Sequence, residues 1–539
     1  MIANIPILTL IALSPLLGVL ILLFMPQDKS RAMKVIAIAS TVLTLGLATW
    51  MYAAYEYSGK GTAYEENVRW INIALNKEFM AEQGFASYSI QFNYHLAMDG
   101  ISLLLVLLTA VVSVMAALAS FHIKKRTKMY FILFLLLEVG MFGVFMARDL
   151  FLFFLFFEVT LVATYFLIGI WGYGGRERAA NKFLIYNGFG SALMLIAFVL
   201  LIATAGFTID TASNAQGHYM YSGSLSTIMQ NLLDPNSYVN MNPEQMTSAF
   251  FMSDGMKTTI FVLLLVAFGI KLPFFPFHTW MLKVHNEAPP AVVMIHSGIL
   301  LKMGAYGLIR FALFLFPHQA ESWSTTLAIL GVVNILYGAV LALVQREFKL
   351  VLAYSSISHM GVVLLGLSAL NEIGLQGAMY QMISHGFISA LFFLIVGSLY
   401  ERTRTTQLDE LGGLARSMPF MSGILLIAGL ASLGLPGLSG FVGEFLSFLG
   451  LFSTMKVVAV VGALGIILGA VYVLRGVLGI TYGPMEDRYI GIRDARLIEA
   501  VPMIALTALI VLLGVYPTIL IDPLQHSFDQ FLELIKVGG

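Results

Sequence analysis

Five ionisable side chains lie inside long apolar stretches of the sequence, where a charge is costly. They are Glu138 in FLLLEVGMFG, Glu158 in FLFFLFFEVTLVATYFL, Lys271 in AFGIKLPFFPFH, Lys302 in GILLKMGAYG and Glu444 in GFVGEFLSF. A charge at the centre of a bilayer costs about 2.5–3.5 kcal/mol on insertion scales, so such groups usually face protein or a hydrated cavity. Burial pushes Glu and Lys toward neutrality, and neighbouring charges push them back. These residues are therefore candidates for stepwise proton transfer.

The competing interpretation is that each charge belongs to an ion pair that holds two helices together. Five such groups on five separate stretches weaken that interpretation and favour a proton path. We expect the side chains of Glu158 and Lys271 to approach within reach of a salt bridge or a bridging water. Arg310 and Arg475 lie nearer the ends of their stretches, where a long side chain can extend to the membrane surface.

Two histidines lie in the middle of apolar stretches, His359 in YSSISHMG and His385 in YQMISHGFISA. Histidine titrates near neutral pH and can relay protons, so these two are also candidates for the path. The alternative is a packed core histidine, which we favour for three residues nearer the ends of their stretches: His278, His285 and His296. No His and carboxylate pair has the tight spacing of metal ligands, so no metal site is expected.

The stretch that carries Lys271 also carries Pro273 and Pro276, which a helix interior should avoid. A proline lacks an amide donor and clashes with the preceding turn, so it breaks the helix and frees backbone carbonyls. At membrane depth those carbonyls can be satisfied only by protein or water. The break therefore predicts a hydrated cavity beside Lys271. GLPGLSGF, at 434–441, interrupts a second stretch in the same way, and Glu444 follows it.

The elements that must position these residues are membrane-spanning helices. Of the 539 residues, 59% are hydrophobic and 11% are charged, whereas about a quarter of a soluble domain is charged. Apolar stretches of about 20 residues predict an all-α polytopic membrane protein with about fourteen spans. Their expected ranges are 5–25, 33–55, 97–121, 129–147, 150–171, 183–206, 258–282, 291–315, 324–345, 348–369, 375–399, 419–452, 455–477 and 498–519.

The two interrupted spans, the seventh and the twelfth, lie five spans apart. Two five-span units, spans 4–8 and 9–13, would then have opposite orientations, as in transporters built from inverted repeats. Simple helix kinks are the alternative. The expected division of the chain is 1–128 for the first three spans, 129–315 for the first repeat, 324–477 for the second and 478–539 for the last span and tail.

Lysine and arginine are concentrated in the loops after odd-numbered spans, for example in HIKKRTK after the third. Such loops face the cytoplasm, so both termini and the two long loops, 56–96 and 207–257, are expected outside. The first stretch, 5–25, lacks a basic leader and a cleavage site, so we interpret it as a span and not as a signal peptide.

The sequence also excludes several classes of function. It contains no cysteine, which rules out disulfides, thiolate-held iron–sulfur clusters and c-type haem attachment in this chain. Its formal net charge is zero, so there is no electrostatic case for binding nucleic acid.

Four ordered strings carry a family resemblance: DLFLFFLFFEVTLVATYFLIGIWG, GIKLPFFPFHTWMLKVHNEAPPAVVMIHSGILLKMGAYGLIR, YSSISHMG and GLPGLSGFVGEF. They resemble the antiporter-like subunits of respiratory complex I and the Mrp cation/proton antiporter subunits, from the third span through the thirteenth. L-type, N-type and Mrp subunits carry lysine after the second break, whereas M-type subunits of complex I carry glutamate. Glu444 therefore makes the chain similar to the M type.

The resemblance implies roles for individual residues. Glu158 matches the family glutamate of the fifth span, Lys271 the lysine of the broken seventh, and Lys302 the bridging lysine of the eighth. The histidines of the central axis and the terminal acid match His359, His385 and Glu444. Phe157 stands where a tryptophan commonly precedes the glutamate, and Glu138 lies outside the core family set as an additional candidate.

The resemblance also implies a proton-translocating subunit of NADH:quinone oxidoreductase in a bacterial plasma membrane, without a redox centre of its own. NADH, FMN, iron–sulfur clusters and quinone are expected in other subunits, and L-type and N-type subunits as neighbours. Three alternatives stay open. The chain could be an Mrp-type cation/proton antiporter subunit, a passive membrane scaffold, or part of a related complex that receives electrons from ferredoxin.

Overall fold

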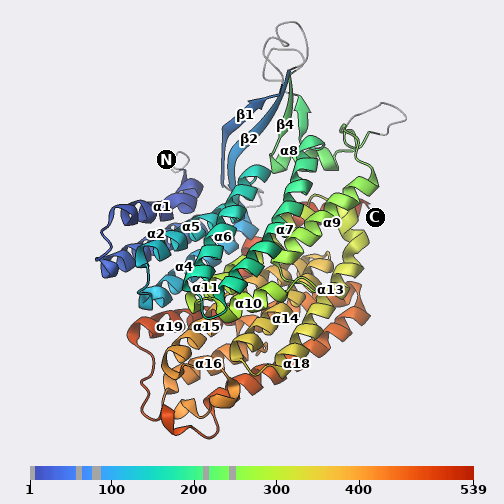
Figure 1. The fold of residues 1–539 in the computed structure, drawn as a ribbon. Helices are drawn as coiled ribbons and strands as arrows, with labels where there is room; N and C mark the ends of the chain where they lie inside the picture. Colours follow the sequence, from blue (N-terminus) through green and yellow to red (C-terminus); the bar gives the residue numbers. More distant parts are fainter. Residues whose placement is uncertain (1–5, 56–63, 76–86, 210–217, 242–249, 539) are drawn as a thin grey trace.

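The structure is a computed structural model that describes residues 6–55, 64–75, 87–209, 218–241 and 250–538 (Figure 1). In this part of the chain, twelve helices are long and apolar enough to cross a membrane. They are α1 (Ile7–Phe24), α2 (Ser30–Ala54), α4 (Gly100–Ala119), α5 (Thr127–Met146), α6 (Leu150–Trp171), α7 (Arg176–Ala203), the helix 290–313, α13 (Pro317–Val344), α14 (Phe348–Ser368), α15 (Glu372–Thr403), α18 (Lys456–Thr481) and α19 (Leu497–Val515). The prediction of a helical polytopic membrane protein is confirmed.

The seventh and twelfth predicted spans are each made of two helices separated by a short segment of turns. The first consists of α9 (Asp254–Lys271) and α10 (Thr279–Glu287), and the second of α16 (Pro419–Ser432) and α17 (Ser439–Thr454).

Pro273 and Pro276 supply no amide to the first break. In the second, Gly434 and Gly437 adopt φ values of 78° and 91°, which glycine tolerates because it has no Cβ. Both breaks therefore lie where the sequence predicted them.

The helix 290–313 is itself irregular. It comprises α11 (Pro290–Ile295), the π-helical segment η3 (His296–Leu300), α12 (Leu301–Gly307) and a second π-helical segment, η4 (Leu308–Leu313). π-helical turns are rare and occur frequently at functional sites. Lys302 is the second residue after the first of them.

The two long loops contain regular structure that the sequence analysis did not predict. Strands β1 (Tyr64–Ala74), β2 (Ser87–Met98), β3 (Phe207–Ile209) and β4 (His218–Ser222) form one sheet in the order β1-β2-β4-β3. The pairs β1/β2 and β3/β4 are antiparallel, and β2 and β4 are parallel. Helix α8 (Leu225–Leu233) follows β4. The described parts of both loops therefore form one folded unit at one end of the bundle (Figure 1).

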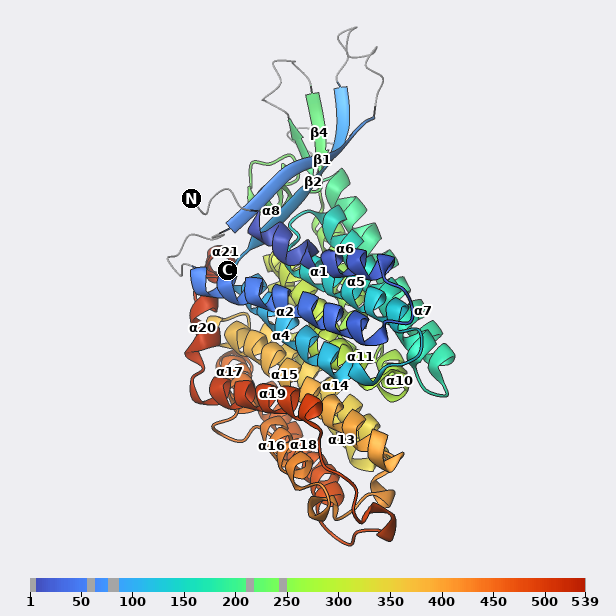
Figure 2. The same cartoon turned by 90° about the vertical axis from the view of Figure 1, so that its left-hand side faces the viewer.

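Both ends of the described chain lie on the side of this sheet (Figure 2). The Leu8 amide at the start of α1 donates to Glu66 of β1 at 2.8 Å. Helix α20 (Thr518–Leu524) packs against Gly100 at the start of α4, and α21 (Asp529–Gly538) places Phe531 against Phe314 at 5.1 Å. Four short 3-10 turns complete the fold: η2 (Ser120–His122), η5 (Leu408–Glu410), η6 (Leu414–Arg416) and η7 (Asp487–Tyr489).

The helices differ in how much of their surface the protein covers. The apolar segments of α15 and of the helix 290–313 are completely buried, and that of α14 is mostly buried. In contrast, α2, α7, α18 and α19 leave most of their apolar segments uncovered, as expected for helices that face lipid. Lys302, His359 and His385 all lie on the three central helices.

Candidate functional site

A lysine and a histidine meet at the centre of the bundle. The Lys302 Nζ atom lies 2.7 Å from Nδ1 of His385 and donates to the Ser297 carbonyl oxygen at 2.5 Å. In the described part of the chain, no carboxylate lies within 4.0 Å of this amine. An ammonium can donate to an unprotonated imidazole nitrogen, and transfer of that proton leaves an amine and an imidazolium. The contact therefore has the geometry of a proton donor and its acceptor.

The chain of contacts continues from His385 to a second histidine. The ring centres of His385 and His359 lie 5.3 Å apart. The other nitrogen of His385, Nε2, lies 3.2 Å from the Ser356 hydroxyl, which in turn lies 3.3 Å from the Ser297 hydroxyl. A hydroxyl both donates and accepts, so Ser356 can accept a hydrogen bond from His385 while it donates one to Ser297.

His359 joins this chain to the acid of the second break. Its Nδ1 atom lies 3.3 Å from Oε1 of Glu444 and 3.2 Å from Nε2 of Gln381, and its Nε2 atom lies 3.2 Å from the Ser432 hydroxyl. Unprotonated Nδ1 accepts from the Gln381 amide, whereas protonated Nδ1 donates to the Glu444 carboxylate. The protonation state of His359 therefore selects between two partners.

A small cavity lies beside this junction. Its volume is about 20 Å³, and Ser358, His359, Ser432, Glu444 and Tyr472 contribute to its lining. A cavity needs roughly 10–15 Å³ and two or more polar partners to hold a water molecule. The space next to Glu444 thus fits one water with several donors and acceptors around it.

Lys271 and Glu158 lie at the other break without direct contact. Lys271 is buried at the end of α9, with Nζ 5.0 Å from the ring centre of Phe157 and 5.5 Å from that of Phe183. The two residues are electrostatic neighbours but form no ion pair within 4.0 Å. Neither the Lys271 amine nor Oε1 of Glu158 has a hydrogen-bond partner among the described residues. A salt bridge between them, one of the two expected contacts, is therefore absent.

Two buried histidines lie closer to the lysines than the sequence suggested. Nε2 of His285 lies 3.0 Å from Nδ1 of His296, and His296 is an electrostatic neighbour of both Lys271 and Lys302. His285 belongs to α10, the short helix after the first break, and His296 starts the π-helical segment before Lys302. The predicted seventh span ends at residue 282, which placed His285 near a membrane surface, whereas α10 continues to Glu287. The sequence therefore did not indicate this pair.

Glu138 stays apart from these contacts. It is completely buried on α5, and neither of its carboxyl oxygens has a hydrogen-bond partner in the described part of the chain. Of the seven candidate residues, the structure therefore places Lys302, His385, His359 and Glu444 in one series, in which the two histidines meet only through their rings. Glu158 and Lys271 are electrostatic neighbours, and Glu138 is unconnected.

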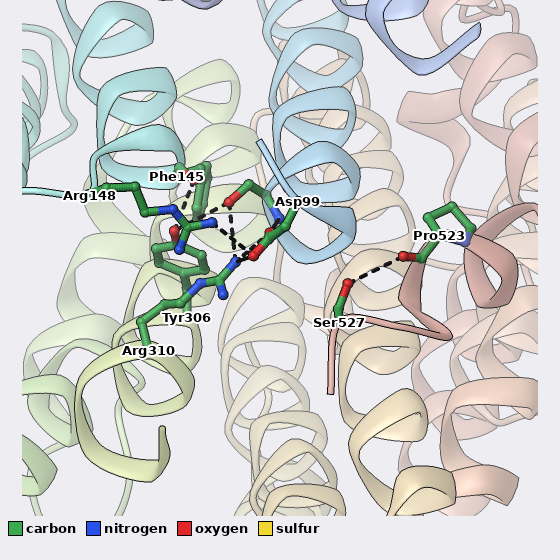
Figure 3. A network of polar contacts seen from close by, with 8 residues as sticks. Asp99, Phe145, Arg148, Tyr306, Arg310, Pro523 and Ser527 are labelled. Atoms are coloured by element: carbon green, nitrogen blue, oxygen red, sulfur yellow. Dashed lines mark hydrogen bonds and ion pairs between the residues drawn. The ribbon is translucent and has the colours of Figure 1, made fainter. Parts of the chain in front are cut away.

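Arg310 does not extend to the membrane surface, which corrects the expectation from its position. It is buried and donates to both carboxyl oxygens of Asp99, while Nη2 of Arg148 donates to Oδ2 of Asp99 at 2.8 Å (Figure 3). Tyr306 donates to the Phe145 carbonyl oxygen at 2.9 Å beside them (Figure 3). Arg475, in contrast, is exposed.

Asp99 caps the start of α4 by accepting from the Ser102 amide at 2.9 Å. Burial alone would raise the pKa of this carboxyl, but Arg310 and Arg148 hold the pKa well below its usual range. The carboxylate is therefore ionised at neutral pH and ties the ends of α4, α5 and the Lys302 helix together.

Within the described residues, no group of three or more His, Asp or Glu side chains is placed to hold a metal ion.

A protein-family model described as "NADH:quinone oxidoreductase/Mrp antiporter, TM" matches residues 147–469 of the chain. That range contains Glu158, Lys271, Lys302, His359, His385 and Glu444.

The chain is similar to subunits of respiratory and antiporter complexes over nearly its whole length. It is 35% identical over 535 residues to NADH-quinone oxidoreductase subunit M of Rickettsia prowazekii (strain Madrid E), covering 98% of this chain and 99% of that protein. A chain of respiratory complex I from Thermus thermophilus with bound NADH superposes with a TM-score of 0.80 at 27% identity, covering 98% and 99%. A chain of the Mrp complex from Dietzia sp. DQ12-45-1b has the same fold, with a TM-score of 0.77 at 18% identity and coverage of 99% and 100%.

Proposed function

The chain belongs to the NADH:quinone oxidoreductase/Mrp antiporter family of membrane proteins, and we propose that it is the proton-translocating M subunit of a complex I membrane arm. The similarity to subunit M spans both chains almost completely, and Glu444 is the residue that distinguishes the M type within the resemblance. The observation that carries a proton path is the buried series of contacts from Lys302 through His385 and His359 to Glu444.

In this proposal a proton moves between groups that are already in contact. Lys302 gives a proton to Nδ1 of His385, and the hydrogen on Nε2 of His385 is free to move toward the Ser356 hydroxyl. Ser356, His385 and His359 line a cavity of about 10 Å³, and a water there would carry the proton from the Ser356 hydroxyl to His359. His359 then turns its Nδ1–H toward Glu444, which releases the proton to the adjoining cavity. The steps at Lys302–His385 and at His359–Glu444 use contacts that already exist, and the step between the two histidines needs the bridging water.

Charge changes at Glu158 and Lys271 would drive these steps. Two unit charges 4 Å apart interact by about 4 kcal/mol at an effective dielectric constant of about 20, which changes a protonation equilibrium by a factor of about a thousand. Glu158 and Lys271 lie farther apart than this, so a charge change at one shifts the protonation equilibrium of the other by less. Since His296 is an electrostatic neighbour of both lysines and bonds to His285, this pair is placed to couple Lys271 to Lys302. We assign Glu138 an accessory role as a further buried acid.

The proposed architecture has fourteen spans when α9–α10 and α16–α17 are each counted as one broken span. Spans 4–8, within 129–315, and spans 9–13, within 324–477, would form the two inverted repeats, and residues 1–128 and 478–539 would flank them. The five-span separation of the two breaks supports this division. The basic loops would face the cytoplasm of a bacterial cell, with the sheet and both termini outside.

The partners follow from the same proposal. L-type and N-type subunits would lie beside this chain in the membrane, and other subunits would carry NADH, FMN, iron–sulfur clusters and quinone. The name of the Rickettsia relative, NADH-quinone oxidoreductase subunit M, supports a place in a multi-subunit complex. The second candidate function, an Mrp-type cation/proton antiporter subunit, is supported by the likeness of fold to the Dietzia complex.

One purification separates these two functions. The chain should be tagged at its C-terminus, isolated from its native membrane with its partners, and reconstituted into sealed vesicles. We expect L-type and N-type subunits in the complex and quinone-dependent NADH oxidation that drives proton movement. Copurification of Mrp subunits instead, with proton movement driven by a sodium or potassium gradient, would support the antiporter.

A further inference from the structure

A large cavity lies at the end of the bundle opposite the sheet, away from the buried proton path. Its volume is about 680 Å³, within the usual range of small-molecule sites. Residues of α2, η2, α15 and α19 line it, together with the loops that follow η2 and α15. Trp171, Tyr173 and Tyr400 contribute aromatic surface. We call it the basic cavity because of its six lysine and arginine side chains: Arg31, Lys34, Lys124, Arg402, Arg404 and Arg496.

The positive charge of the basic cavity is not balanced by the protein. Its lining contains two acids, Glu401 and Glu499. Glu499 is paired with Arg402 at 2.6 Å, and Glu401 lies 3.4 Å from the His122 ring. Within the described ranges, Arg31, Lys34, Lys124 and Arg404 have no ion-pair partner. The cavity therefore presents an excess of positive charge to whatever fills it.

Lys34 gives a second indication of a ligand. This lysine is only 7% exposed, yet its amine contacts no carboxylate among the described residues. Its Nζ atom donates to the Phe121 carbonyl oxygen at 2.5 Å and lies 5.0 Å from the Phe121 ring centre. An ammonium has three donors, and buried donors are normally satisfied. The remaining donors of Lys34 are available to an acceptor in the cavity.

The cavity adjoins the surface that would face lipid. Val35 on α2 is 58% exposed, and Leu497 on α19 is 83% exposed, next to the cavity residues Lys34 and Arg496. A basic pocket between membrane helices, bordered by apolar surface and aromatic rings, suits a headgroup whose acyl chains lie outside. We propose that the basic cavity binds the phosphate group of an anionic lipid headgroup and so bridges α2, α15 and α19.

The test measures lipid binding to the full-length chain in its native complex. The delipidated complex is titrated with a fluorescent phosphatidylglycerol and with the matching phosphatidylcholine, and inorganic phosphate is added as a competitor. We expect tighter binding of phosphatidylglycerol. Each basic residue near an anionic lipid contributes about a factor of five, so Arg31→Gln with Arg404→Gln should weaken binding about 30-fold. The pair Arg31→Lys with Arg404→Lys keeps the charge and should retain binding.

Arg178 and Arg346 provide the matched control. Both are exposed arginines outside the basic cavity, so Arg178→Gln with Arg346→Gln removes the same charge and should leave lipid binding unchanged. An unchanged melting temperature of the Arg31/Arg404 variant shows that it is folded. The proposal is overturned if that variant binds phosphatidylglycerol like the wild type, or if the wild type does not prefer it over phosphatidylcholine. Full displacement by millimolar inorganic phosphate would reassign the cavity to a free anion.

Discussion

The amine of Lys302 lies 2.7 Å from Nδ1 of His385, and the two groups lie on helices that the protein covers completely. A lysine in such a place usually pairs with a carboxylate, because an isolated buried charge is costly. Here the neighbour is a second titratable base, so a proton on either nitrogen atom can pass to the other across this contact. This arrangement stabilises neither group in one fixed charge state, which is what a relay requires.

His385→Gln should test this shared proton directly. The substitution keeps a polar side chain but removes the titrating acceptor, so we expect proton pumping to fall by about a hundredfold, the lower end for transfer by a positioned side chain. Pumping is measured by dye quenching in vesicles that contain the purified complex. His318→Gln, at an exposed histidine, is the control and should pump normally. Normal pumping by the His385 variant would remove it from the path.

Gln381 should influence whether Nδ1 of His359 accepts from an amide or donates to Glu444. Gln381→Leu removes the amide that competes with Glu444 for Nδ1 of His359, so the proton should stay on the His359–Glu444 pair and pumping should slow. Gln376 lies on the same helix and bonds to Glu372 instead, which makes Gln376→Leu a matched control. If both variants pump at the same rate as the wild type, the exchange of partners at His359 has no role.

Asp99→Asn should lower the stability of the folded protein. The variant leaves Arg148 and Arg310 buried without a carboxylate, and breaking a buried pair in this way costs about 3–5 kcal/mol. We expect a lower melting temperature of the purified complex. Glu410→Gln breaks a half-exposed pair with Arg488 and should change stability by less than about 1 kcal/mol. Equal melting temperatures for the two variants would contradict the account.

The same network predicts a pH dependence. Because the folded pKa of Asp99 is lowered, its stabilising effect is present above the unfolded carboxyl pKa of about 3.9 and is lost as the pH falls through the folded pKa. The difference in melting temperature between wild type and Asp99→Asn should therefore stay constant from about pH 5 to pH 8. A difference that disappears within this range would show that Asp99 is protonated in the folded protein.

His296→Phe should reveal whether the histidine pair couples the two lysines. A phenylalanine keeps the packing against Trp280 and Phe183 but removes the contact with His285. We expect an assembled complex whose pumping is reduced, as measured in the same vesicles. Wild-type pumping in this variant would show that His285 and His296 serve only in core packing, as the sequence suggested.

Local rules made the two breaks and the residues beside them predictable. Prolines and glycines that cluster within a few residues interrupt a helix, whereas single ones such as Pro15 and Pro502 lie inside continuous helices. The positions of Lys271 and Glu444 relative to the two breaks therefore follow from the sequence. Burial of His359 and His385 follows equally from their place in the middle of apolar stretches.

Long-range contacts were not predictable in this way. The Arg310–Asp99 contact joins residues 211 positions apart, and the pairing of β2 with β4 joins two loops that each read as polar. Hydrophobic periodicity shows which face of a helix is buried but not which partner it meets. The His285–His296 contact joins residues only 11 positions apart, but it depends on how α10 turns after the break, which the sequence pattern does not show.

The most direct test of the proton path is Glu444→Gln. Glu444 is buried, contacts Nδ1 of His359 at 3.3 Å and borders the small cavity, so the amide removes the titrating group with little change of shape. The complex that carries this variant should assemble, as judged by native electrophoresis, and Glu444→Lys should restore part of the activity because it supplies another titratable group. The deciding measurement is the number of protons moved per NADH oxidised in reconstituted vesicles. We expect a clear decrease for Glu444→Gln, and a ratio equal to that of the wild type would exclude Glu444 from the proton path.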